Sequence, residues 1–257
     1  MGEITPTADE IMSIVAARHL LDGQVCFVGI GLPSEAANLA RLTHAPEVVL
    51  VYESGTIGTR PEVLPLSIGD GELAEHADLV VSVPEIFAYW LQAGRVDVGF
   101  LSAAQIDRYG NLNSTVIGDY ARPTVRLPGA GGAPEIASSA GEVIVMLRHT
   151  KRTFVESVDF VSSIGFGRKG EGRHGHRGAG PSVVITDLGI LRPDSTTNEL
   201  ELIAVHDGVD VGEVVGSTGW ALRVSDDVTT VDPPTERELE VLRDLKHRTT
   251  VAHSRRP

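Results

Sequence analysis

Short runs of β-branched and aliphatic residues recur between helical patterns along this chain of 257 residues, and their alternation limits the available folds most strongly. The predicted strands cover residues 25–28, 48–52, 79–83, 98–101, 143–147, 152–155 and 183–186. Amphipathic spacing predicts helices over residues 7–21, 35–42, 84–93 and 234–247. Strands mixed with helices in this way predict an α/β fold, with an open, largely parallel sheet flanked by helices.

The strand predicted over residues 48–52 leads directly into Glu53-Ser54-Gly55. Its sequence, Val-Val-Leu-Val-Tyr, is typical of a parallel strand buried on both faces. Open α/β sheets bind their ligands at the carboxyl ends of such strands, and Gly55 permits a sharp turn there. Glu53 is therefore a candidate functional carboxylate. A helix-capping or loop glutamate is the alternative interpretation.

A glycine-rich segment, Pro128-Gly129-Ala130-Gly131-Gly132-Ala133-Pro134-Glu135, provides a second signal. Glycines let the backbone approach a ligand closely and turn its N–H groups toward a negative oxygen, as an oxyanion hole requires. A tight turn without function is the alternative. Gly29-Ile30-Gly31 resembles the start of a dinucleotide-binding fingerprint, but Ser34 replaces the third glycine. We therefore reject a Rossmann cofactor site.

Charge and cysteine content exclude several functions. The formal net charge of −13 disfavours sequence-independent binding to nucleic acid, which depends on clustered Lys and Arg. The single cysteine, Cys26, lies in an apolar run and is expected to be a core residue; a catalytic thiol is the alternative. No apolar stretch approaches the roughly 20 residues of a membrane helix, and the N-terminus has no signal-peptide pattern. A cytoplasmic protein is predicted.

The segment 167–181 contains six glycines, three arginines, two histidines and a lysine, so we expect a loop. A basic, glycine-rich loop in an acidic protein suits phosphate binding, and a solvated surface loop is the alternative. His174 and His176 lack a nearby cysteine or carboxylate cluster, and no metal site is predicted. We expect one domain over residues 1–257, with a polar, frayed tail at 248–257.

Taken together, these motifs resemble the family I coenzyme A-transferases, in particular the β subunits of the glutaconate and 3-oxoadipate type. The resemblance rests on Gly29-Ile30-Gly31-Leu32-Pro33, Glu53-Ser54-Gly55, residues 94–113 and Gly129-Ala130-Gly131-Gly132-Ala133, and it continues to about Gly219. The chain departs from the family at Ser102, where the family has glycine. The implied fold is that of coenzyme A-transferases and NagB-like proteins.

The resemblance implies that Glu53 is the catalytic nucleophile. In the family, this glutamate attacks an acyl-CoA thioester to form an acyl-glutamyl anhydride, and coenzyme A thiolate converts the anhydride into a glutamyl-CoA thioester. The backbone N–H of Gly132 matches the oxyanion donor. The residues implied to contact coenzyme A or substrate are Gly131, Ala133, Ser54, Gly55 and Gln105. Gln105 has a structural role as an equal alternative. No permanently bound cofactor is expected, because coenzyme A thioester is the substrate.

The family's active site lies between a β-type and an α-type subunit, so an α-type partner chain is implied, in an αβ pair that doubles to α2β2 or larger. A dicarboxylate or oxo-acid acceptor is expected, with succinyl-CoA or acetyl-CoA as donor. Arg60, Arg122, Arg126 or an arginine of the partner are candidates to bind the acceptor carboxylate. The alternatives are a coenzyme A-ester hydrolase on the same scaffold, a sugar-phosphate isomerase or ligand-sensing regulator, and a non-catalytic scaffold subunit.

Overall fold

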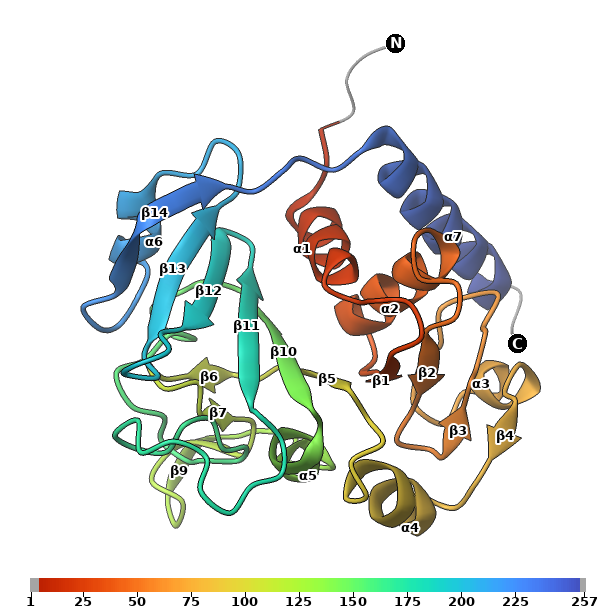
Figure 1. Ribbon diagram of the computed structural model, residues 1–257, viewed down its shortest axis with the longest axis horizontal. Helices are drawn as coiled ribbons and strands as arrows, with labels where there is room; N and C mark the ends of the chain where they lie inside the picture. Colours follow the sequence, from red (N-terminus) through yellow and green to blue (C-terminus); the bar gives the residue numbers. More distant parts are fainter. Residues whose placement is uncertain (1–4, 255–257) are drawn as a thin grey trace.

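The computed structural model describes residues 5–254 and contains a ten-stranded sheet with the order β14-β13-β12-β11-β10-β5-β1-β2-β3-β4 (Figure 1). In chain order, these strands are β1 (Val25–Phe27), β2 (Val49–Val51), β3 (Thr56–Ile57), β4 (Leu79–Val80), β5 (Val98–Leu101), β10 (Glu142–Leu147), β11 (Pro181–Thr186), β12 (Gly189–Pro193), β13 (Leu200–Val205) and β14 (Arg223–Thr230). The five central strands, from β11 to β2, run parallel. The predicted α/β class with a largely parallel sheet is confirmed.

Helices cover both faces of the sheet. They are α1 (Ala8–Arg18), α2 (Leu32–Leu42), α3 (Gly71–Glu75), α4 (Val83–Glu85), the π-helix η1 (Ile86–Leu91), α5 (Ala133–Ser139), α6 (Val211–Gly216) and α7 (Glu236–Ser254). No helix among residues 5–254 combines the length and apolarity needed to cross a membrane.

Side chains of the central strands alternate between two apolar cores, because successive residues of a strand point to opposite faces. On β10, Ile144 and Met146 face the core under α1, α2 and α7, whereas Val143 and Val145 face the core under η1, α5 and α6. A strand buried on both faces needs apolar residues at successive positions, so the central strands could be predicted from continuous apolar runs in the sequence.

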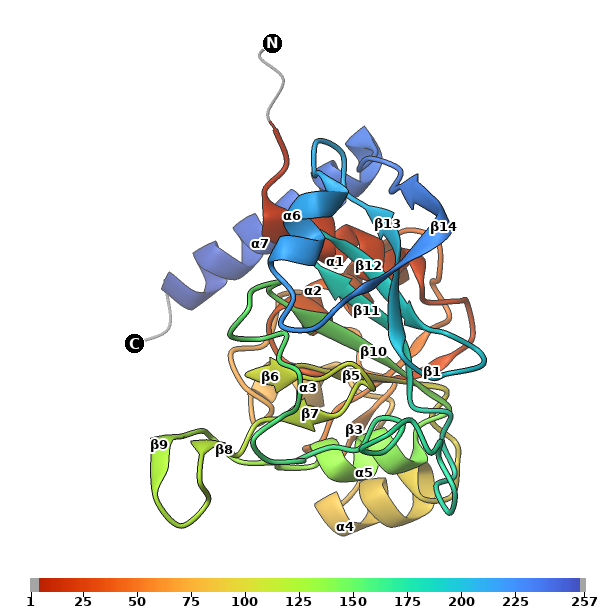
Figure 2. The same cartoon turned by 90° about the vertical axis from the view of Figure 1, so that its left-hand side faces the viewer.

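Two small sheets extend the second face of the molecule. β6 (Gln105–Ile106) pairs with β7 (Leu112–Asn113), and β8 (Val116–Gly118) pairs with β9 (Pro123–Arg126). Figure 2 shows the β8–β9 hairpin projecting from the body. The chain returns from this hairpin into the glycine-rich segment and α5.

Two predictions about local structure are wrong, and a third is confirmed except at its last residue. Residues 152–155 form no strand; Thr150 and Thr153 close a tight turn, and Phe154 makes one isolated bridge to Ile106. Residues 167–180 form a loop, as predicted for 167–181, and only Pro181 departs from the prediction, because it begins β11. The tail is not frayed between residues 248 and 254, because α7 continues to Ser254, and residues 255–257 lie outside the described part. The single-domain organisation stays a prediction.

Candidate active site

Glu53 lies in a three-residue loop that joins β2 to β3. The N–H of Tyr52 donates to the carbonyl of Thr56 at 3.0 Å, and the N–H of Gly55 donates back to Tyr52 at 2.9 Å. Gly55 has φ of +97°, in the left-handed region that a three-residue hairpin loop requires at its last position. The predicted sharp turn after the strand is therefore present, and it places Glu53 at the carboxyl end of β2.

Tyr52 anchors the base of this turn. Its ring is fully buried, and its hydroxyl lies 3.0 Å from the Ser34 hydroxyl on α2. Burial raises the pKa of Tyr52 to about 12, so the phenol stays neutral and keeps this hydrogen bond. The position of Glu53 is thus fixed from beneath by α2.

The glycine-rich segment approaches Glu53 from the start of α5. Gly129 and Gly131 adopt φ values of +109° and +50°, and Gly132 is the N-cap of α5. On β5, Gly99 leaves room for Ile136 of α5, whose Cγ2 would overlap any β-carbon at position 99. This close packing of helix on strand brings the segment to the sheet edge where Glu53 lies.

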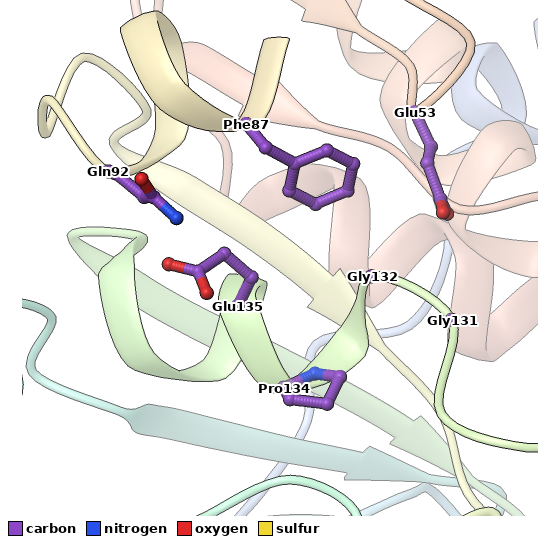
Figure 3. A pocket seen from close by; sticks show the side chains of 7 residues that line it. All are labelled: Glu53, Phe87, Gln92, Gly131, Gly132, Pro134 and Glu135. Atoms are coloured by element: carbon purple, nitrogen blue, oxygen red, sulfur yellow. The ribbon is translucent and has the colours of Figure 1, made fainter. Parts of the chain in front are cut away.

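A cavity of about 330 Å³ joins the two segments. Its lining residues are Glu53, Phe87, Gln92, Gly131, Gly132, Pro134 and Glu135. Figure 3 shows Glu53 beside the Gly131-Gly132 backbone, with the Phe87 ring between Glu53 and Gln92. A β-carbon at Gly132 would lie 3.3 Å from Cδ of Glu53. The predicted nucleophile and the predicted oxyanion loop are therefore neighbours.

The amides of this loop are free to bind an oxygen. Among residues 5–254, the N–H groups of Gly131 and Gly132 donate to no protein acceptor. Unpaired backbone N–H groups in a cavity that also holds a carboxylate can stabilise a negative oxygen of the kind that develops during acyl transfer.

Three of the predicted site residues, Glu53, Gly131 and Gly132, line the cavity, and four do not. Gly55 shapes the turn, and Ala133 is the first residue of α5. The hydroxyl of Ser54 is buried without a hydrogen-bond partner among the described residues. Whether Ser54, Gly55 and Ala133 contact coenzyme A stays a prediction.

Gln105, the fourth residue outside the cavity, is buried in β6 within a polar network. It donates to Oδ2 of Asp159 at 3.0 Å and accepts from Nδ2 of Asn113 at 2.7 Å. These bonds occupy the side-chain amide and hold the base of the β8–β9 hairpin, because Asp159 also accepts from the N–H of Gly118. The geometry favours the structural role for Gln105.

The cavity also has walls that the sequence did not reveal. Pro134 and Glu135 directly follow the glycines, so their position in the motif was an available signal. Phe87 and Gln92 come from η1 and its end, where only a helical pattern was visible. No motif in that segment distinguishes these two residues from ordinary helix positions.

None of the arginines considered for carboxylate binding lines the cavity. Arg60 pairs with Asp78 at 2.9 Å, and Arg126 lies over the Tyr120 ring at 5.0 Å on the projecting hairpin. Arg122 is exposed on the same hairpin. Within the described part of the chain, the cavity wall thus offers two carboxylates and no cation.

Cys26 and the histidines of the basic loop lie apart from the site. Cys26 is fully buried in the core beneath α1 and α2, and burial raises the pKa of its thiol, as expected for a core residue. In residues 5–254, one group could hold a metal by the proximity of its ligand atoms, Glu72, Glu75 and His76 near α3, and it includes neither His174 nor His176. The absence of a bound metal stays a prediction.

Comparison with known proteins identifies the class of this site. The model of the coenzyme A transferase family matches residues 10–217. A 3-oxoadipate CoA-transferase subunit of Pseudomonas knackmussii is 58% identical over 96% of both chains. A glutaconate CoA-transferase subunit of Acidaminococcus fermentans is 36% identical, covering 93% of this chain and 91% of that protein. The crystal structure of glutaconate coenzyme A-transferase from this organism superposes with a TM-score of 0.87 over 93% of this chain and 94% of that one, at 33% identity.

A more distant relative carries a different name. The cholesterol ring-cleaving hydrolase IpdB subunit of Mycobacterium tuberculosis is 27% identical over 92% of this chain and 93% of that protein.

The fold and the matched residues thus define an enzyme of the transferase class. The chain belongs to the coenzyme A transferase family, and the resemblance inferred from its motifs is confirmed. Membership in this family sets aside the isomerase and regulator alternatives.

Proposed function

We propose that this chain is the glutamate-bearing subunit of a heteromeric coenzyme A-transferase and that Glu53 is its covalent nucleophile. The observation that carries the proposal is the position of the Glu53 carboxylate beside the unpaired amides of Gly131 and Gly132 in one cavity. Relatives named as subunits of 3-oxoadipate and glutaconate CoA-transferases support it.

The chemistry proceeds in two balanced steps. A carboxylate oxygen of Glu53 attacks the acyl carbon of the thioester, the carbon–sulfur bond breaks, and coenzyme A leaves as thiolate with an anhydride formed on Glu53. The thiolate then attacks the carbonyl carbon of the glutamyl side, and the donor acid leaves as a carboxylate. Glu53 is left as a thioester of coenzyme A. A second acid reverses both steps and carries coenzyme A away.

The glycine loop lowers the barrier to these steps. Each attack produces a tetrahedral centre with a negative oxygen, and preorganised N–H donors stabilise that charge more strongly than water does in a dry site. Gly132 supplies such a donor because it is buried beside the carboxylate and its N–H makes no other hydrogen bond among residues 5–254.

The proposed substrates are succinyl-CoA or acetyl-CoA as donor and a dicarboxylate or oxo acid as acceptor. The name of the 58% identical relative, a 3-oxoadipate CoA-transferase subunit, supports this class. Since the cavity wall bears no cation among the described residues, we assign the acceptor's distal carboxylate to an α-type partner subunit in an α2β2 or larger assembly.

The test is mass spectrometry of the complex of this chain with its α-type partner after incubation with acyl-CoA. A coenzyme A adduct on the peptide that contains Glu53 supports the transferase. Turnover without an adduct after rapid quenching supports a hydrolase, in keeping with the ring-cleaving hydrolase relative. Glu53→Gln should lower the rate about a thousandfold or more; unchanged activity in this variant would leave a scaffold role.

A further inference from the structure

The turn that follows η1 brings two free arginines to the edge of the candidate cavity. Gln92 lines the cavity, and the chain turns immediately after it, with the N–H of Gly94 donating to Leu91 at 2.9 Å. Arg95 is the next residue. The guanidinium of Arg177 packs against Gly94 so closely that a β-carbon at position 94 would overlap it. Arg95 therefore follows in sequence, and Arg177 packs against, a glycine that comes two residues after Gln92 of the cavity wall.

Neither guanidinium has a partner among residues 5–254. Both arginines are exposed, and neither side chain forms an ion pair or hydrogen bond with any residue in that range. Arginines elsewhere in the fold, such as Arg18 and Arg243, are held by carboxylates at 2.7 Å. In a protein of net charge −13, two unpaired cations at one place mark a local site of positive potential.

Hydrogen bonds to neighbouring segments hold the loop that carries Arg177 in place. Arg173 donates from Nε to the carbonyl of Gly178 at 2.7 Å and from Nη1 to that of Gly165 at 2.7 Å, and it also donates to the carbonyl of Ala137 on α5. The N–H of Gly178 donates to Ser138 at 2.9 Å. Arg173 is thus used for structure, and Arg177 is held in place relative to the helix that follows the oxyanion loop.

The charges around the cavity match the distribution of charge along a coenzyme A thioester. Glu53 and Glu135 make the interior of the cavity unfavourable for an anion. The arm of coenzyme A next to the thioester is neutral, and its amide groups can form hydrogen bonds with Gln92 and Glu135. The other end of coenzyme A carries a diphosphate and a 3′-phosphate, which favour guanidinium partners. A molecule with its sulfur at Glu53 and its arm beside Gln92 would direct those phosphates toward Gly94.

Resting on the proposed function, we propose that Arg95 and Arg177 form the binding site for the phosphate groups of coenzyme A. This assigns the basic glycine-rich loop to phosphate binding and assigns no role in the chemical step to either arginine. Activity with a substrate that lacks the nucleotide should not depend on either side chain.

The experiment compares the wild-type complex with Arg95→Gln, Arg177→Gln and the double variant, using an acyl-CoA, its 3′-dephospho analogue and the matching acyl-pantetheine ester. Arg192→Gln on β12 is the control, because Arg192 is likewise exposed and without an ion pair in the described residues. We expect the double variant to lose about tenfold or more in kcat/KM for acyl-CoA. Activity with acyl-pantetheine and the KM of the acceptor acid should stay within about twofold.

Equal losses with acyl-CoA and acyl-pantetheine would overturn the proposal, as would no loss with either. A rise in the KM of the acid alone would also overturn it, because the arginines would then bind the acceptor carboxylate. None of these results would contradict the proposed function. That function is tested separately, by coenzyme A transfer and formation of the Glu53 adduct in the wild-type complex. If the double variant fails to fold, the single variants provide the same comparison.

Discussion

Glu53 and Gly132 come from segments far apart in the sequence, yet a methyl group on Gly132 would lie only 3.3 Å from Cδ of Glu53. The same methyl would lie 2.5 Å from Cζ of Phe87. Gly132 has φ of −82°, which any residue adopts, so the need for glycine here is steric. The absence of a side chain brings a free amide next to the carboxylate, as the proposed acyl transfer requires.

Gly132→Ala should therefore impair activity far more than folding. The added methyl must displace Phe87 or the loop, which moves the amide from Glu53, and loss of one oxyanion donor costs about 10²–10³ in kcat. Overpacking should destabilise by only about 1–3 kcal/mol. Steady-state kinetics and thermal unfolding of the complex measure both quantities. Gly216→Ala is the control, because a β-carbon there meets nothing within 4 Å; similar kcat values for the two variants would contradict the prediction.

Gly55→Ala should disrupt the turn that presents Glu53. Alanine would have to adopt φ of +97°, and its methyl would overlap the carbonyl oxygen of Val81, so the loop would have to separate from the residue that follows β4. Gly23→Ala provides the control, since Gly23 has φ of +76° with nothing within 4 Å. We expect Gly23→Ala to cost about 1 kcal/mol in unfolding free energy and Gly55→Ala at least about twice as much. Equal shifts in urea unfolding would show that the Val81 contact is unimportant.

The part of the site that was predictable is the part built from strand ends and glycines. The buried run before Glu53 and the glycines at 129–132 are local signals, because burial on both faces and tight turns restrict residue type directly. Phe87 and Gln92 reach the cavity only through the packing of η1 against the second core. Such tertiary placement leaves no local signature in a helical segment.

The incorrect local predictions have similar causes. Residues 152–155 are rich in strand-forming types, but Phe154 is used to stack on the buried His149 ring at 3.8 Å from inside a turn. The end of α7 is polar and yet helical, because Arg248 pairs with Asp244 at 2.8 Å and donates to the carbonyl of Glu62. No strand is predicted from the sequence at β14, which lacks an apolar run because it is an edge strand whose residues are largely exposed. At Phe154 and Arg248 a tertiary contact thus overrides composition, and β14 was missed because an exposed edge strand needs no apolar run.

Arg243→Ala should loosen α7 from α1. Nε and Nη2 of Arg243 bind the two carboxylate oxygens of Glu10 at 2.7 and 3.0 Å, and the Glu10 side chain is only 8% exposed. Removal of the guanidinium leaves a buried carboxylate without its cation, which should cost about 1–3 kcal/mol of unfolding free energy. Arg237→Ala is the control; its pair with Glu240 is 70% and 73% exposed, so we expect less than about 0.5 kcal/mol.

The same ion pair predicts how the Arg243→Ala effect varies with pH. The hydrogen bonds from Arg243 lower the pKa of Glu10 from 4.5 to about 2, so the folded state favours the charged form. This contribution to stability is fully present above pH 4.5 and is lost as the pH falls toward 2. The difference in stability between wild type and Arg243→Ala should therefore narrow over that range. A difference that stays constant down to about pH 2 would contradict the assignment to Glu10.

His149 should make the protein less stable in weak acid. Its ring is 4% exposed, stacks on Phe154, and lies 2.9 Å from the Thr218 hydroxyl. Burial lowers the pKa of His149 from 6.5 to about 4, so the unfolded chain binds a proton at a higher pH than the folded protein does. The stability that comes from the neutral ring is present above pH 6.5 and is lost as the pH falls from 6.5 to 4. The loss amounts to about 3 kcal/mol.

Urea unfolding between about pH 7.5 and 4 measures this slope. His149→Gln removes the titration, so the variant should be less stable at the upper end of this range and its stability should fall less steeply toward the lower end. His206 is also buried with a lowered pKa, caused mainly by desolvation, and it titrates in the same direction. The slope that remains in His149→Gln should therefore decrease further in the double variant with His206→Gln. If wild type and the double variant show the same slope, the acid sensitivity has its origin in carboxylates such as Glu10 instead.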